Sequence, residues 1–191
     1  TGLVEDKAAD RVRYMEIKWA PAFHLECGLT LDEVIDTVAG AAASAAARCG
    51  VVVRLTVVAL RSADPAATVE VAHAAVAHRT SGVTGFDLAG FEAAHPDPTV
   101  HAAAFEVARA GGLGLTVHTG ELLDDGALVW RALQLQPQRI QRSRVHVAPG
   151  ACGRQRLFAS AALQRDVDRA RLRVGRGAEG GSAQDAGSGC H

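Results

Sequence analysis

The stretch that decides the fold is VVVRLTVVAL, residues 51–60. Its residues are β-branched and almost all apolar, which predicts a strand buried on both faces, as in a parallel sheet. Three other segments have the composition or the alternation of strands, at residues 12–20, 83–88 and 113–117. Residues 139 and 140 resemble the start of a further strand that does not continue.

Helical patterns separate these strands. Residues 31–49 follow Thr30, whose spacing from Glu33 predicts a capping box, and the helix is expected to stop at Gly50. Further helices are expected at residues 65–80, 98–110 and 124–135. A βα unit that repeats every 30–40 residues or so predicts a parallel sheet, either doubly wound or a barrel. No Gly-x-Gly-x-x-Gly follows a strand, so nothing supports dinucleotide binding.

The composition changes near residue 140. Residues 1–140 hold 11 basic and 17 acidic residues, whereas residues 141–191 hold 9 arginines and 4 acids, so the net charge changes from −6 to +5. The second segment is rich in Gly, Ala and Arg and buries too little apolar surface to fold. We therefore expect a folded region over residues 1–140 and a disordered basic tail over residues 141–191, with one weak helix at residues 157–172.

The overall composition limits the partners and the compartment. A net charge of −1 argues against nucleic acid as the main partner, and no apolar run is long enough to span a membrane. The four cysteines lie far apart without a Cys-x-x-Cys motif, which favours reduced thiols and a cytoplasmic protein. A sheet with too few strands to close leaves open edges, so self-association is expected.

Polar residues follow two of the apolar strands. His118 directly follows the strand at residues 113–117, where an imidazole can hold a metal. Glu121 lies three residues later, close enough to exchange protons with a molecule bound to that metal. Gly90 follows the strand at residues 83–88 and lets the backbone approach a ligand closely. The structural alternative is a histidine at the sheet edge, a glutamate in the first turn of a helix and a turn glycine.

Four motifs, in this order along the chain, resemble those of adenosine deaminases. They are EIKWAP at residues 16–21, GLT at 28–30, DLAGFE at 87–92 and HTGE at 118–121. The resemblance covers roughly residues 10–140 and implies a partial (β/α) barrel, with four to five of its eight βα units. It also implies zinc as the cofactor, a purine nucleoside such as adenosine as the substrate, and hydrolytic deamination to inosine and ammonia.

The resemblance also implies roles for single residues. His118 corresponds to a zinc ligand, Glu121 to the acid that protonates ring nitrogen N1 of the purine, and Gly90 to the glycine whose N–H contacts the purine. Thr119 stands where the family usually has alanine. Phe91 stands where adenosine-specific members usually have aspartate, which leaves the identity of the purine open.

Several family motifs are missing from the sequence. It holds no His-x-His pair and no late Asp-Asp, and after residue 140 it continues Gln-Arg-Ser-Arg where the family has Gly-His-Gly. One histidine does not hold a catalytic zinc, which takes three protein ligands. Codons CGG-TCA-CGG for residues 142–144 contain Gly-His-Gly in a shifted frame, so we hypothesise that residues from about 141 onward are frameshifted.

Two functions from different classes therefore remain, and a third, a nucleic-acid binder, rests only on the basic residues 141–191. The first is a zinc-dependent adenosine deaminase that is inactive as this fragment. The second is a non-catalytic βα scaffold or interaction protein derived from that family.

Overall fold

The computed structural model describes residues 1–122, 126–141 and 156–158. The strands form one parallel sheet in which each pairs with its neighbours along the chain, in the order β1-β2-β3-β4-β5-β6. Their bounds are Tyr14–Trp19 (β1), Val52–Leu60 (β2), Val83–Ala89 (β3), Gly114–His118 (β4), Arg139–Gln141 (β5) and Arg156–Phe158 (β6). This arrangement confirms an α/β fold of the partial-barrel type.

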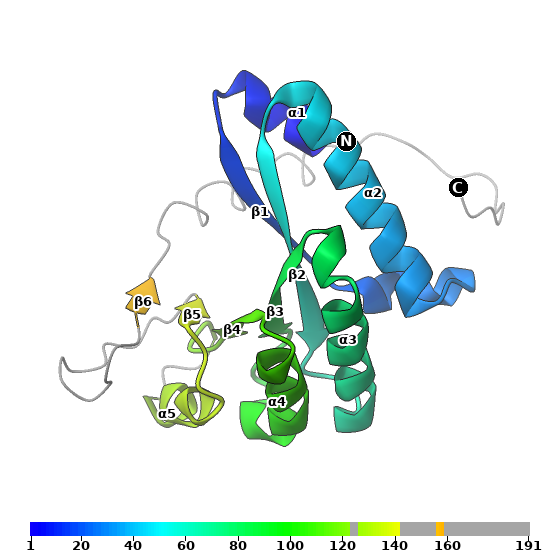
Figure 1. Ribbon diagram of the computed structural model, residues 1–191. Helices are drawn as coiled ribbons and strands as arrows, with labels where there is room; N and C mark the ends of the chain where they lie inside the picture. The colour runs from blue at the N-terminus through cyan, green and yellow to red at the C-terminus, as the bar shows by residue number, and fades with distance from the viewer. Residues whose placement is uncertain (123–125, 142–155, 159–191) are drawn as a thin grey trace, which may run out of the picture. The chain divides into compact units, whose positions relative to one another are not determined.

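Helices connect the successive strands from β1 to β5, as parallel pairing requires. The α-helices are Gly2–Ala9 (α1), Leu31–Cys49 (α2), Pro65–Ala77 (α3), Ala102–Ala110 (α4) and Gly126–Gln134 (α5), and 3-10 helices occupy Pro21–Cys27 (η1), Arg79–Ser81 (η2) and Pro98–His101 (η3). Helices α2, α3 and α4 lie along one side of the sheet (Figure 1).

The helix-covered face of the sheet forms the hydrophobic core. Leu55 and Val57 of β2, Phe86 and Leu88 of β3, and Val117 of β4 point into it and are at most 2% exposed. Small helix residues such as Ala72 let the helices approach the strands closely, and the ring of Phe105 packs edge-on against Phe86. Because side chains alternate between the two faces of a strand, the residues next to these core residues point to the opposite face of the sheet.

The opposite, concave face is polar, and its side chains reach across the sheet. Lys18 of β1 donates to Gln141 of β5 over 2.6 Å, and Arg139 of β5 donates to Glu16 of β1 over 2.9 Å. Strands β1 and β5 are not neighbours in the sheet, so these contacts require the sheet to curl as in a half-barrel. The polar side chains of the strands therefore gather on the concave face of the curled sheet.

The capping box of α2 is confirmed. The Thr30 hydroxyl accepts from the Glu33 N–H, the Glu33 side chain accepts from the Thr30 N–H, and Gly50 ends the helix in the left-handed conformation. Asp64 caps α3 by accepting from the N–H of Ala66. These local signals placed the helix starts correctly.

Three expectations need correction. Strand β2 is buried on both faces only from Leu55 onward, because the side chains of Val52 and Arg54 alternate with those of the core residues and are exposed. The helix expected at residues 98–110 begins as the 3-10 turn η3. The weak helix expected at residues 157–172 is wrong at its start, since Leu157 and Phe158 pair with β5 in strand β6.

The remaining predictions for the tail, its disorder and its frameshift, fall on residues 142–155 and 159–191, which lie outside the described residues. The boundary at residue 140 therefore stays a prediction. Over the part of the chain that the structure describes, no helix has the length and apolar character needed to cross a membrane.

Candidate functional site

The carboxyl ends of β1, β3 and β4 bring a histidine, an aspartate and a lysine together on the concave face. His118 Nδ1 lies 3.0 Å from Asp87 Oδ2, and Lys18 Nζ donates to the same oxygen over 2.8 Å. Asp87 is fully buried. Burial alone would raise the pKa of Asp87, but the hydrogen bond and charge of His118, with the ammonium of Lys18, outweigh it and hold the pKa below its usual value.

A second buried carboxylate shapes the turn that follows His118. Glu92 is 1% exposed and accepts four hydrogen bonds from four successive residues. Its Oε1 accepts from the Thr119 hydroxyl and the Gly120 N–H, each over 2.8 Å, and its Oε2 accepts from the N–H groups of Glu121 (3.0 Å) and Leu122 (3.2 Å). Although burial opposes the charge, these donors keep the pKa of Glu92 below its usual value.

Arg61, directly after β2, links the same segments. The residue is 3% exposed, and its side chain donates to the carbonyl oxygens of His118 over 2.6 Å and His95 over 3.1 Å. Its guanidinium lies 3.9 Å from Glu92 Oε1. Its backbone N–H donates to the Ala89 carbonyl over 2.8 Å, so Arg61 joins the ends of β2, β3 and β4.

The structure places the three predicted site residues at these same strand ends. His118 is the last residue of β4, and Glu121 lies on the turn that Glu92 binds. Gly90 follows β3 with φ +136°, and a Cβ there would lie 3.3 Å from the Arg61 nitrogen. The glycine is therefore needed for the backbone path beside Arg61. The ring of Phe91 is 63% exposed.

Three residues of this site were not singled out from the sequence: Arg61, Lys18 and Gln141. Arg61 directly follows β2, Gln141 ends β5 and Lys18 is the last residue but one of β1, so a polar residue near the carboxyl end of a strand is the signal that could have identified them. Their partners lie on other strands, up to 123 positions away in the sequence, and one sequence does not reveal such pairs.

The metal site is incomplete. Among residues 1–122, 126–141 and 156–158, no group of three or more His, Cys, Asp or Glu side chains could hold a metal ion. His118 is one suitable donor, since its Nδ1 pairs with Asp87 and its Nε2 is left to bind a metal. A catalytic zinc takes three protein ligands, so the described residues do not form a zinc site by themselves.

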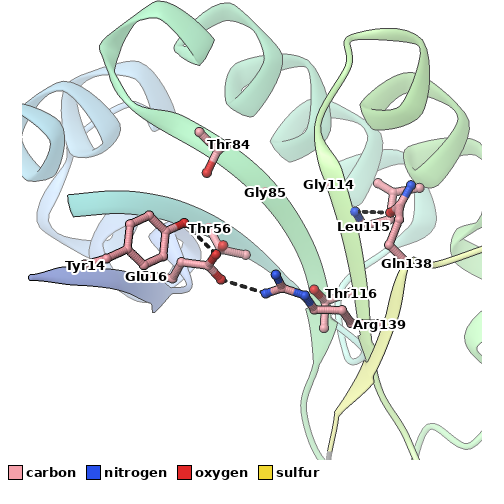
Figure 2. Close-up of a pocket in the computed structure, with 10 residues that line it drawn as sticks. All are labelled: Tyr14, Glu16, Thr56, Thr84, Gly85, Gly114, Leu115, Thr116, Gln138 and Arg139. Atoms are coloured by element: carbon pink, nitrogen blue, oxygen red, sulfur yellow. Dashed lines mark hydrogen bonds and ion pairs between the residues drawn. The ribbon is translucent and has the colours of Figure 1, made fainter. Parts of the chain in front are cut away.

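A separate pocket of about 360 Å³ lies on the concave face near the amino ends of the strands. Figure 2 shows its lining, in which Tyr14 donates to Glu16 over 2.8 Å and Arg139 pairs with the same carboxylate. The Tyr14 hydrogen bond and the charge of Arg139 outweigh burial and lower the pKa of Glu16. None of the predicted site residues lines this pocket, so the two ends of the face are chemically distinct.

Comparison with known proteins gives a consistent result. The family model described as adenosine deaminase matches residues 2–146. An adenosine deaminase of Mycobacterium ulcerans is 47% identical over 123 residues, which is 62% of this chain and 33% of that protein. The chain thus spans about a third of the length of this curated relative.

Two solved structures have the same fold over most of the chain. A zinc-bound amidohydrolase from Burkholderia ambifaria has a TM-score of 0.67 at 27% identity, covering 72% of this chain and 38% of its own. An adenine deaminase from Arthrobacter aurescens has a TM-score of 0.65 at 27% identity, covering 73% of this chain and 42% of its own. The half-barrel described above is therefore a portion of a larger known fold.

Proposed function

This chain belongs to the adenosine deaminase family, and from that premise we propose that it carries one part of the active site of a zinc-dependent, hydrolytic adenosine deaminase. The reaction converts adenosine and water to inosine and ammonia. We propose further that the chain does not turn over substrate alone, because its described residues offer one of the three protein ligands that a catalytic zinc takes.

The pairing of His118 with Asp87 is the observation that carries this proposal. Because Nδ1 of His118 faces the carboxylate, the ring offers Nε2 as a metal ligand. Metal-binding histidines usually have this arrangement, in which a carboxylate fixes the tautomer and raises the basicity of the ligand. Lys18 compensates the charge of Asp87 from the other side. Since the remaining ligands lie outside the described residues, we assign no step through zinc to this chain.

Glu121 and Gly90 have the roles of substrate-contacting groups in the proposal. The Glu121 carboxyl would donate a proton to ring nitrogen N1 of the purine, which makes the adjacent carbon a better electrophile. The Gly90 N–H would donate a hydrogen bond to the purine. Support comes from their location, since both follow strand ends that Arg61 joins.

A second candidate is a non-catalytic scaffold or interaction protein. The incomplete ligand group among the described residues favours it. This candidate predicts that His118 and Glu121 can be replaced without loss of the chain's function, whereas the first predicts that they are competent once the missing ligands are supplied.

A chimera separates the two candidates. Residues 10–140 of this chain would replace the matching segment of the Mycobacterium ulcerans adenosine deaminase, which supplies the rest of the barrel. We expect the chimera to bind one zinc ion and to lower the absorbance of adenosine as inosine forms. Glu121→Gln should abolish turnover while zinc stays bound, and His118→Ala should lose both. A folded chimera without zinc and activity would instead support the scaffold.

The chain itself gives the matching control. With adenosine and added zinc we expect no turnover from the 191-residue protein. Turnover above that of a His118→Ala variant would show that the residues outside the described ranges complete the site, and would overturn the inactive part of the proposal.

The preferred purine is tested at Phe91 in the same chimera. Adenosine-specific members of the family usually have aspartate at this position, whereas this chain has an exposed phenylalanine. We expect Phe91→Asp to raise kcat/KM for adenosine relative to adenine. An unchanged ratio would place the specificity elsewhere.

A further inference from the structure

We propose that Arg61 and Glu92 form a pair of positioning residues that hold the 118–122 turn by its backbone, Glu92 through the turn's N–H groups and Arg61 through its first carbonyl. This inference rests on the proposed function, because it concerns the turn that carries His118 and Glu121. Neither residue contacts the substrate in the proposal. Each acts through the turn.

The contacts of Glu92 account for the last three N–H groups of the turn, whereas the Thr119 N–H donates to the Gln141 carbonyl over 3.4 Å. Its carboxylate binds the Thr119 hydroxyl and the three successive N–H groups of Gly120, Glu121 and Leu122, all within 3.2 Å. Three N–H groups that converge on one anion make a backbone nest, and charge-assisted hydrogen bonds of this kind are strong and directional. The position of the Glu121 backbone is therefore set by a residue of the segment after β3.

Arg61 binds the carbonyl oxygen of the first residue of the turn. Its 2.6 Å hydrogen bond to the His118 oxygen fixes the last peptide of β4, from which the imidazole projects. The same side chain donates to the carbonyls of His95 and Pro96, so the segment that follows Glu92 is held as well. One guanidinium thus ties the end of β4 to the 90–96 segment.

The two charges compensate each other inside the protein. They lie 3.9 Å apart, and both side chains are at most 2% exposed. Buried ion pairs seldom add much stability over apolar residues of the same size, because desolvation offsets their attraction. What the pair offers over an apolar one is direction: apart from the bond to the Thr119 hydroxyl, its hydrogen bonds end on the backbone of the two segments that bear the proposed site residues.

The first experiment uses the unaltered chain. The Glu92 carboxylate carbon and the amide protons of residues 120–122 are followed by NMR through an acid titration, with Glu70, an exposed residue of α3, as the reference carboxylate. We expect the three amide shifts to titrate with the same midpoint as Glu92, below the usual range of a glutamate pKa. Amide shifts that follow another carboxylate would overturn the proposal.

The second experiment uses variants of nearly equal size, Glu92→Gln and Arg61→Lys, with Glu70→Gln and Arg48→Lys as exposed controls. We expect amide exchange at residues 120–122 to accelerate about tenfold or more in the first pair only, as the loss of a charge-assisted hydrogen bond implies. The nitrogen signals of the His118 ring should also lose the single-tautomer pattern that pairing with Asp87 imposes. Exchange in α2 and β2 reports whether each variant is folded.

The outcomes distinguish this inference from the proposed function. If a folded variant leaves both the exchange of the turn and the His118 signals unchanged, the positioning role fails, whatever the activity of the chimera. If both readouts change while the chimera lacks activity, the positioning role stands and the proposed function fails. If the unfolded signals of a variant dominate, the titration of the unaltered chain decides.

Discussion

The two ends of the concave face use charged residues in opposite ways. At the carboxyl ends of the strands, Arg61, Asp87 and Glu92 are almost completely buried, and every one of them bonds to a neighbouring strand or turn. At the amino ends, Glu16 and Arg139 pair beside an open pocket, with 28% and 52% of their side chains exposed. Both ends are polar, but only the first is protected from water.

The difference indicates which end of the concave face has a functional role. A buried charge is costly unless its partners are fixed, so a protein that keeps three of them at one place needs their geometry there. An exposed pair costs little and adds little, because water screens it. Substitutions at the two ends should therefore differ several fold in their effect on the free energy of unfolding, and four experiments test this contrast.

The largest effect is expected for Arg61→Met. The substitution keeps most of the buried volume but leaves the Glu92 carboxylate without its cation and the His118 carbonyl without its donor. We expect a loss of about 3–5 kcal/mol in the free energy of unfolding, the cost of breaking a buried pair at one partner. Urea denaturation followed by circular dichroism measures it. A loss below that of the exposed pair would remove the contrast.

Asp87→Asn should come next, at about 2–3 kcal/mol near neutral pH, because both Lys18 and His118 lose a charged acceptor. The pKa of Asp87 is lower in the folded chain than in the unfolded one. Its stabilisation is therefore present above about pH 4 and is lost as the pH falls through the folded value. Denaturation at a series of pH values should show the two proteins converging in acid. A gap independent of pH would assign the effect to packing.

Gly85→Ala tests the amino end by size rather than charge. A Cβ at Gly85 would lie 2.6 Å from the Thr56 hydroxyl oxygen on the neighbouring strand. We expect a loss of about 1–2 kcal/mol from this overpacking, most of which Thr56→Ala in the same chain should restore. The double-mutant cycle measures the coupling. Additive effects would mean that the strands separate locally instead.

The smallest effect is expected for Glu16→Gln and Arg139→Gln. Their ion pair is partly exposed, so its coupling energy should lie below about 1 kcal/mol and fall with added salt. A double-mutant cycle at two salt concentrations measures this. A coupling energy as large as the loss expected for Arg61→Met would show that the pocket end is as protected from water as the site.

The parallel α/β sheet could be predicted from sequence periodicity and the partial barrel from the resemblance, whereas much of the site could not be predicted. Strands β2, β3 and β4 have apolar runs of the right length, and Thr30 and Glu33 gave the start of α2 from local chemistry alone. Helix α1 and the 3-10 turn η1 were missed, since they lack a pronounced apolar face or are too short to have one.

The site shows a similar limit. His118, Glu121 and Gly90 stood out because they follow strands, and the structure brings their segments together. The role of Glu92 depends on where the turn at residue 120 passes relative to β3, and that of Arg61 on which carbonyls come within reach. These are consequences of sheet curvature, for which the local sequence has no signal. That His118 binds metal and Glu121 transfers a proton remain proposals.

The sheet order also has a consequence for how the chain acquires its structure during synthesis. Because every strand pairs with the one made just before it, each βα unit can dock on a finished template as it leaves the ribosome. The Lys18–Gln141 and Glu16–Arg139 contacts join residues 123 positions apart and can form only after β5 is made. Loop-closure entropy makes such distant contacts late events, so the curl of the sheet should be fixed last, after the site residues on β3 and β4 are already in place.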